Sequence, residues 1–183
     1  MLGKDSGMNL PGNFLTSFML SIEKKSIKYL TSQFTKPGVV DWIGVRSGRG
    51  LPLTSVDAVQ AIAKVGLEGD HYASKGGKRQ VTLILREHIS TVASMVGMDE
   101  IDPSLLRRNI VISGINLLAL KGKRFHLGTA VLEYTGECHP CSRMEENLGD
   151  GGYNAMRGHG GIRCRVLESG VIGVGDELVV FSD

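Results

Sequence analysis

The chain has 183 residues, enough for one domain with a sizeable core, and its 42% hydrophobic and 22% charged residues exclude a disordered chain. A formal net charge of +2 excludes the strong basic excess of a dedicated nucleic-acid-binding protein. The 25 glycines, set against only 5% aromatic residues, predict an aliphatic core with many tight turns and not a helix bundle.

Residues 1–37 differ in pattern from the rest of the chain. Apolar side chains recur there at helical spacing, with lysines between them: Leu15, Phe18, Met19, Ile22, Tyr29 and Leu30. Lys36-Pro37-Gly38 ends this pattern. We therefore expect an N-terminal helical extension over residues 1–37 and one domain over residues 38–183. The extension would pack on the domain, with a role in dimerisation as the alternative.

The chain lacks the usual signs of membrane insertion or secretion. No apolar run reaches the roughly 18 residues of a spanning helix, and the apolar stretch at residues 13–22 has no basic segment before it and no small-residue cleavage site after it. The three cysteines are odd in number and too few for a disulfide-stapled secreted domain. These features predict a cytoplasmic protein with no membrane partner.

From residue 39 onward the pattern favours short strands separated by glycine, proline and serine. Strands are predicted at residues 39–45, 58–65, 81–85, 110–112, 130–134, 163–167 and 177–181. In residues 130–134, Ala130, Leu132 and Tyr134 would face one side of a sheet, and Val131 and Glu133 the other.

Two helical segments interrupt these strands. Ile89, Val92, Ala93 and Val96 lie at i, i+3, i+4 and i+7, and Gly97 supplies a stop for a helix. Asp102-Pro103 resembles an N-cap followed by proline, which predicts a helical turn reaching Arg107. Six or more short strands with few helices predict a mainly β, barrel-like domain with peripheral α-helices.

The segment with most chemical content runs from Tyr134 to Glu146. It places Cys138, His139, Cys141 and Arg143 directly after a predicted strand, and the spacing of Met144 and Leu148 predicts a helical turn that Gly149 ends. Cys141 would then lie near a helix N-terminus, where unpaired N–H groups stabilise a thiolate. A thiolate there would act as a nucleophile, as a sulfur carrier through a persulfide, or as a soft metal ligand. A structural pair of buried cysteines is the alternative.

Three further segments carry basic residues beside glycines or strand ends. The glycine-rich residues 149–161 hold Arg157 and His159, which would cradle a phosphate unless the segment is a plain barrel-corner loop. Arg79 lies in residues 76–80, directly before a strand, and Arg107-Arg108-Asn109 precedes the next strand. Adjacent guanidiniums suit bidentate phosphate binding. Such strand ends would meet at one mouth of a barrel.

Together these segments resemble the MOSC family, which is named for the C-terminal domain of molybdenum cofactor sulfurases. The matching stretches are GLEGDHYASKGGKRQVTLI (66–84), LRRNIVISGINLLALKGKRFHLGTAVLEYTGECHPC (106–141) and GGYNAMRGHGGIRCRVLESGVIGVGD (151–176). The likeness is to the small stand-alone bacterial type. One departure is His71-Tyr72, where many relatives carry Arg-His after Gly-Asp.

The resemblance implies a mainly β, barrel-like fold and binding of the molybdenum cofactor, molybdopterin. It marks Cys141 as the residue that ligates molybdenum or carries sulfur as a persulfide, and it places Arg107 and Asn109 near the cofactor. Arg157, His159 and Arg79 would join them around the pterin phosphate.

The implied activity is either reduction of N-hydroxylated compounds or delivery of sulfur to another cofactor site, which favours an enzyme with a small-molecule substrate. Reduction needs a redox partner, because the sequence has no flavin, haem or iron–sulfur motif, and sulfur delivery needs a sulfur-donor protein. Two alternatives remain: a dithiol–disulfide oxidoreductase that uses Cys138 and Cys141, and a non-catalytic cofactor carrier.

Overall fold

The computed structural model describes residues 25–72 and 76–181. The chain divides into two compact units, residues 1–33 and residues 34–183. In the first unit, helix α2 spans Ile27–Ser32 and is capped by Ser26, whose hydroxyl accepts a hydrogen bond from the Tyr29 N–H at 3.2 Å. Of the predicted extension, the positions from Leu15 to Ile22 lie outside the described residues.

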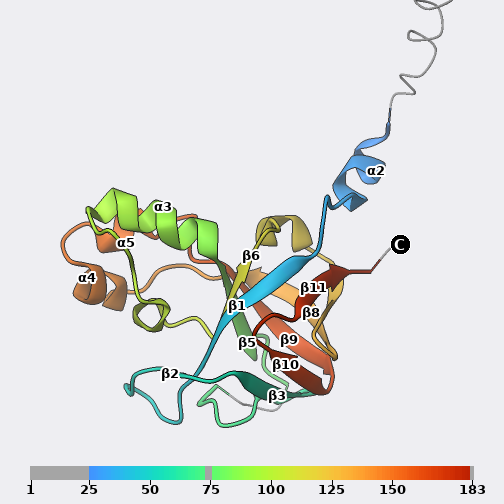
Figure 1. Ribbon diagram of the computed structural model, residues 1–183, viewed down its shortest axis with the longest axis horizontal. Coiled ribbons are helices and arrows are strands. Elements are labelled where there is room, and N and C mark those ends of the chain that lie inside the picture. Colours follow the sequence, from blue (N-terminus) through green and yellow to red (C-terminus); the bar gives the residue numbers. More distant parts are fainter. Residues whose placement is uncertain (1–24, 73–75, 182–183) are drawn as a thin grey trace, which may run out of the picture. The chain divides into compact units, whose positions relative to one another are not determined.

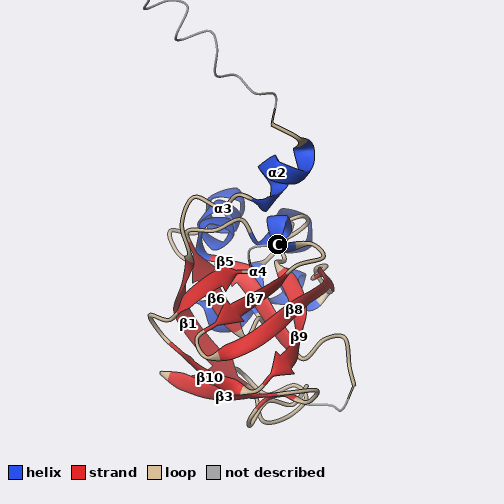
Figure 2. Ribbon diagram, turned by 90° about the vertical axis from the view of Figure 1, so that its right-hand side faces the viewer, coloured by secondary structure: helices blue, strands red, loops and turns tan. Residues whose placement is uncertain are grey.

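The second unit is built on a closed barrel of mixed strands (Figure 2). Around the barrel the strands are β11 (Glu177–Val180), β7 (Arg124–Leu127), β8 (Ala130–Glu137), β9 (Ile162–Glu168), β5 (Val81–Leu85), β6 (Ile110–Ser113) and β1 (Gly38–Val45), and pairing of β1 with β11 closes it. Only β5 and β6 pair in parallel; the other pairs within the barrel are antiparallel. The mainly β, barrel-like fold expected from the sequence is confirmed.

The barrel buries side chains on both faces of its central strands. Leu83 and Leu85 of β5 belong to the interior cluster with Phe125 and Leu132, whereas Ile84 belongs to a second cluster outside the barrel. This alternation explains why β5 is buried along its whole length and apolar except at Thr82, because helices cover the face that would otherwise meet water. On β8, Ala130, Leu132 and Tyr134 pack against the interior, as predicted.

Helices cover one side of the barrel (Figure 1). Helix α3 spans Arg86–Val96 and ends at Gly97, whose left-handed conformation (φ 72°) is the expected stop. Helix α4 spans Arg143–Leu148, α5 spans Gly152–Ala155, and two 3-10 turns, η1 and η2, span Pro103–Leu106 and Leu117–Leu120. In the part of the chain with assigned structure, no helix has the length and apolarity needed to cross a membrane.

Several short strands were not predicted. These are β7, β2 (Thr54–Ser55), which pairs with β1, and β10 (Gly170–Gly173) and β4 (Gly66–Leu67), which flank the predicted β3 (Ala58–Ile62) in a small separate sheet. The strand predicted over residues 58–65 ends early, at Ile62, because Lys64 takes a left-handed conformation with φ 64° and turns the chain.

A pair of histidines lies in the helical layer. The rings of His88, on α3, and His159 contact each other edge to face, with 4.8 Å between their centroids. Within the described residues, neither of their buried Nδ1 atoms has a hydrogen-bond partner. Burial lowers the pKa of His88 from its ordinary value, and the charge of His159 lowers it further, against an opposing effect of Glu87.

We expect this lowered pKa of His88 to make the folded state less stable in mild acid. Below about pH 6.5 the unfolded chain protonates His88 while the folded chain resists it, so the free energy of unfolding falls as the pH falls. His88→Gln should therefore lose less stability than the wild type between about pH 7 and about pH 5 in urea unfolding. His126→Gln, at an exposed position on β7, is the matched control. If the free energy of unfolding fell by the same amount in the wild type and in His88→Gln over this pH range, the expectation would be wrong.

Candidate functional site

A cavity of about 470 Å³ opens where four loops of the second unit meet. These loops follow β1, precede β5, precede β6 and follow β8, and α4 adds one residue. The lining residues are Arg46, Arg49, Gly50, His71, Tyr72, Arg79, Arg107, Arg108, His139, Cys141 and Arg143. The volume lies within the range of about 300–1,000 Å³ that is usual for ligand-binding pockets.

The charges that line this cavity are of one sign. Six arginines and two histidines face it, and within the described part of the chain neither Asp nor Glu is among its lining residues. Cations gathered in one concave site raise the local concentration of anions and bind them by charge-assisted hydrogen bonds. The cavity therefore suits an anionic ligand, and its size suits one larger than a single phosphate.

Cys141 and Arg107, which are 34 residues apart in sequence, meet at this cavity. The carbonyl of Cys141 accepts a hydrogen bond from the N–H of Met144 at 2.8 Å, which holds the cysteine just before α4, as predicted. Its thiol is exposed, and Nη1 of Arg107 lies 3.9 Å from its sulfur. Nη1 of Arg107 donates a long hydrogen bond to this sulfur and places a positive charge beside it. The site therefore combines an accessible sulfur ligand with a positive charge.

The backbone of Arg107 is unusual. It ends η1 in the left-handed region, with φ 59°, a conformation that costs a non-glycine residue on the order of 1 kcal/mol. The side chain of the next residue, Arg108, holds this turn in place. Its guanidinium is buried and donates hydrogen bonds to the carbonyl oxygens of Gly160 (2.7 Å), Leu106 (3.1 Å) and His139 (3.4 Å).

Burial lowers the pKa of the Arg108 guanidinium. The nearby charges of Arg79 and Arg107 act in the same direction, against the opposing effect of Cys138 and Cys141. Because its hydrogen bonds go to backbone carbonyls of three segments, Arg108 fixes the cavity wall and leaves ligand binding to its neighbours.

A buried polar network supports the opposite wall. The Oδ1 atom of Asn109 accepts hydrogen bonds from the N–H (3.1 Å) and hydroxyl (2.7 Å) of Thr82, and its Nδ2 donates to the Asp70 carboxylate at 2.9 Å. Asp70 in turn accepts from the backbone N–H groups of Arg46 (3.1 Å) and Tyr72 (2.9 Å). This chain of bonds links the start of β6 to the two loops that carry Arg46 and Tyr72.

Tyr72 contacts two of the lining arginines. The Cζ atoms of Arg46 and Arg79 lie 5.3 and 5.1 Å from the centroid of its ring, within range of a cation–π interaction. The ring therefore restrains both guanidiniums beside the cavity.

The structure separates the predicted site residues into two groups. Cys141, Arg107 and Arg79 line the cavity, and Asn109 lies behind its wall with its amide bonded to protein atoms. Arg157 and His159 are not lining residues, and their contact with a cofactor stays a prediction.

Close packing accounts for two glycines in the segment that carries Arg157 and His159. A Cβ at Gly160 would overlap the carbonyl oxygen of Cys138, and one at Gly161 would overlap that of Leu83. The N–H groups of Tyr153 and Gly151 donate to Glu145 at 2.7 and 2.8 Å, and these bonds lower the pKa of the Glu145 carboxyl. The close packing of this loop explains two of its glycines without a ligand.

Arg46 and Arg49 were missed by the sequence analysis. They lie in Arg46-Ser47-Gly48-Arg49-Gly50, directly after β1. This segment carries the signal used for the other loops, a basic and glycine-flanked strand end, and so it was open to the same prediction. Cys138 is buried and Cys141 exposed, and both are free thiols in the structure.

The family model of the MOSC domain matches residues 69–179, more than half of the chain. The chain belongs to the MOSC domain family. The matched part of this MOSC protein contains Arg79, Arg107 and Cys141, whereas Arg46 and Arg49 precede it. A comparison with curated proteins gives no match.

Solved structures share the fold of this MOSC protein. The YuaD protein from Bacillus subtilis is 22% identical, with a TM-score of 0.70 over 81% of this chain and 97% of that chain. YiiM from Geobacillus stearothermophilus is 22% identical, with a TM-score of 0.61 over 79% and 75% of the two chains. YiiM from Escherichia coli is 21% identical, with a TM-score of 0.62 over 81% and 71%.

Proposed function

We propose that this MOSC protein binds the molybdenum cofactor in the arginine-lined cavity, with Cys141 as the sulfur ligand that the protein contributes to molybdenum. The observation that carries the proposal is the exposed Cys141 thiol next to Arg107, in a cavity lined by six arginines. Membership of a family associated with this cofactor supports the same conclusion.

The residues present fit the chemistry of the cofactor. Its pterin carries a phosphate, which matches guanidinium groups that can donate two parallel hydrogen bonds. Its metal is a soft acceptor for thiolate, which matches Cys141. Arg46 adds a third feature, because its side chain is buried and its Nε has no hydrogen-bond partner among the described residues. The positive charge of this guanidinium beside the cavity favours an anion there.

The roles of the protein residues follow from their contacts. Cys141 presents its sulfur to the cavity, and Arg107 holds that sulfur in place through a hydrogen bond of 3.9 Å. Arg79 and Arg107 hold the phosphate, and Tyr72 restrains Arg79. Asp70 and Asn109 act as positioning residues, because they bond to the loops and do not line the cavity.

When bound, the molybdenum centre supplies two-electron redox chemistry. The reaction that we propose is reduction of an N-hydroxylated compound. The N–O bond of the substrate breaks, the substrate takes up two electrons and two protons, and the oxygen leaves as water. The electrons come from a separate redox protein.

Sulfur delivery is a second candidate, which the exposure of Cys141 favours. In this role the thiolate takes the outer sulfur from a donor persulfide and releases the donor as a thiolate. A thiol of the acceptor protein then attacks the inner sulfur of the Cys141 persulfide, which forms a disulfide with Cys141 and releases the outer sulfur as hydrosulfide to the other cofactor site. Molybdenum and pterin contents after expression in a host that makes the cofactor distinguish the two candidates. Equimolar metal and pterin would support the reductase, whereas a persulfide on Cys141 in metal-free protein would support delivery.

We expect Arg79→Ala to weaken binding of the cofactor roughly ten- to a hundred-fold, because it removes a charge-assisted hydrogen bond worth about 1.5–3 kcal/mol. Titration of cofactor into metal-free protein measures the affinity. Arg124→Ala, an arginine on β7 with 66% of its side chain exposed, is the matched control and should bind like the wild type.

Arg157→Ala tests the sequence prediction separately, since Arg157 is exposed and does not line the cavity. A loss equal to that of Arg79→Ala would add Arg157 to the phosphate site. Equal affinity of Arg79→Ala and the wild type would remove Arg79 from it.

A further inference from the structure

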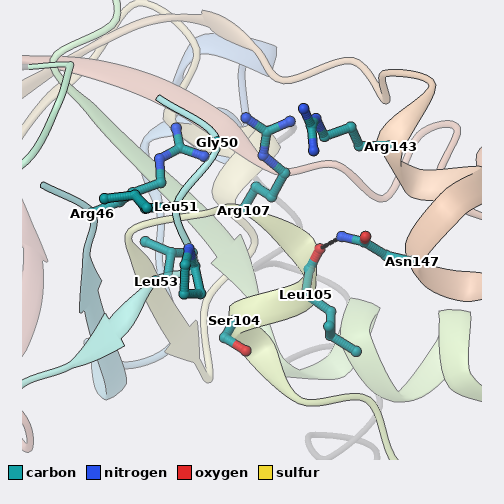
Figure 3. A pocket seen from close by; sticks show the side chains of 10 residues that line it. Arg46, Gly50, Leu51, Leu53, Ser104, Leu105, Arg107, Arg143 and Asn147 are labelled. Atoms are coloured by element: carbon teal, nitrogen blue, oxygen red, sulfur yellow. Dashed lines mark hydrogen bonds between the residues drawn. The ribbon is translucent and has the colours of Figure 1, made fainter. Parts of the chain in front are cut away.

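A second, smaller cavity of about 230 Å³ adjoins the first (Figure 3). The two share Arg46, Gly50, Arg107 and Arg143. The remaining residues that line the smaller cavity are Leu51, Pro52, Leu53, Ser104, Leu105 and Asn147. Because Arg107 lines both cavities and lies 3.9 Å from the Cys141 sulfur, the smaller cavity is next to the proposed metal ligand.

The smaller cavity has two chemically different walls. In Figure 3 the guanidinium groups of Arg46, Arg107 and Arg143 lie along one side, and Leu53, Ser104 and Leu105 lie on the other. The apolar side is carried partly by leucines that are open to solvent, since Leu51 is 52% and Leu105 38% exposed. Exposed leucines beside a row of cations suit a ligand that has both an apolar body and a negative group.

The cationic wall contains one guanidinium that is buried and one that is open to a ligand. Arg46 is only 5% exposed, and within the described residues its Nε has no hydrogen-bond partner. Among the residues that the structure describes, Arg143 makes only a long ion pair with Glu146, at 4.0 Å and with both side chains at least half exposed. Such a pair contributes little and leaves the guanidinium available to a ligand.

The walls are held together before any ligand arrives. Nδ2 of Asn147, on α4, donates a hydrogen bond of 2.6 Å to the carbonyl of Leu105, on η1. This bond ties the helix that carries Arg143 to the turn that carries Leu105 and precedes Arg107. The cavity is therefore a feature of the fold and needs no rearrangement to exist.

We infer that the smaller cavity binds a small organic carboxylate whose oxyanion pairs with Arg143 and whose apolar body lies against Leu53 and Leu105. A volume of about 230 Å³ is below the range of about 300–1,000 Å³ that is typical of drug-sized ligands, so the ligand is small. That this ligand is the substrate rests on the proposed function, because only then does Cys141 hold the reactive metal. The inference thus narrows the substrate to N-hydroxylated compounds that carry a carboxylate.

The inference is tested on cofactor-free full-length protein by following amide resonances during titration with benzoate and with benzamide. Benzoate should shift resonances of residues 104–107 and 143–147 and bind at least about ten-fold more tightly than benzamide, which has the same ring but no charge. Equal affinity of the two probes, or no binding of benzoate, would overturn the inference.

Two variants address the two walls separately. Arg143→Gln should weaken benzoate roughly ten-fold and leave benzamide unchanged, whereas Leu105→Gln should weaken both probes by a similar factor. Leu105 is an exposed side chain, so the second variant should keep the fold. Arg124→Gln is the charge-matched control outside both cavities. Benzoate affinity that neither variant changes would place the probe elsewhere and reject this site.

A repeat with cofactor-loaded protein separates this inference from the proposed function. If the protein retains the cofactor and still binds benzoate, the results support both the inference and the proposed function. If cofactor loads and excludes benzoate, the smaller cavity belongs to the cofactor and the inference fails alone. If no molybdenum or pterin is retained but the variants change benzoate binding as described, the carboxylate site stands and the proposed function fails, together with the role of the ligand as substrate.

Discussion

Cys141→Ser is expected to abolish both molybdenum retention and cofactor-linked reduction while leaving the fold intact. Serine replaces the sulfur ligand with a hydroxyl, which gives up its proton far less readily than a thiol, and a metal ligand must be deprotonated. Cys141 is exposed, so the change in the free energy of unfolding should stay within about 0.5 kcal/mol. Metal analysis, urea unfolding and turnover of an N-hydroxylated amidine with reduced viologen measure the three quantities. Unchanged turnover would remove Cys141 from the site.

Cys138→Ser is the matched comparison. Cys138 is buried and does not line the cavity, so its serine variant should retain metal and turnover even though a buried hydroxyl costs some stability. A dithiol–disulfide oxidoreductase would need both sulfurs. The dithiol mechanism predicts disulfide reduction by metal-free protein. Equal loss of that activity in the two variants would therefore favour the dithiol mechanism.

Asn109→Ala is expected to lower the free energy of unfolding of the cofactor-free protein by about 3 kcal/mol, because it leaves several buried groups unpaired. The variant removes the acceptor for the Thr82 N–H and hydroxyl and a donor to the Asp70 carboxylate. The buried Asp70 carboxylate keeps its bonds from the N–H groups of Arg46 and Tyr72 but loses its side-chain donor, which adds to the cost. Urea unfolding measures the loss.

Asn154→Ala, at an exposed position on α5, controls for the substitution and should change stability by less than about 0.5 kcal/mol. If Asn109 acts through Asp70, its alanine variant should also weaken cofactor binding, because the loops that carry Arg46 and Tyr72 lose their support. A stable Asn109→Ala variant that only loses cofactor would instead indicate direct contact with the ligand.

Local patterns predicted most of the barrel. The strand at residues 81–85, the helix that ends at Gly97 and the turn capped by Asp102 depend on short-range signals, and each is found as expected. The missed strands are those whose local signal is weak. β7 alternates buried Phe125 and Leu127 with exposed neighbours over only four residues, and β10 begins and ends with glycine. Their pairing with β11 and β3 stabilises them, and no sequence window contains that information.

The candidate site was predictable in composition and not in arrangement. Basic, glycine-flanked strand ends could be recognised one at a time, and the structure brings those of Arg79, Arg107 and Cys141 to one cavity. Which side chain points into a cavity depends on the closure of the barrel by β1 and β11 from opposite ends of the domain. Asn109 shows why sequence neighbours do not settle the role of a residue. Its position beside two arginines indicates ligand binding, yet in the structure its side-chain amide forms hydrogen bonds to other protein groups.

The uneven distribution of charge has a practical consequence for solution behaviour. Six of the 21 Lys and Arg residues face one cavity of a chain whose formal net charge is only +2. Bulk properties such as the isoelectric point therefore conceal a strong local attraction for counter-ions. Phosphate, sulfate and citrate from buffers would occupy the same guanidiniums as any ligand and act as competitive inhibitors. Ligand affinity should accordingly depend on the identity of the buffer anion as well as on ionic strength, and a zwitterionic buffer with chloride gives the least obstructed cavity.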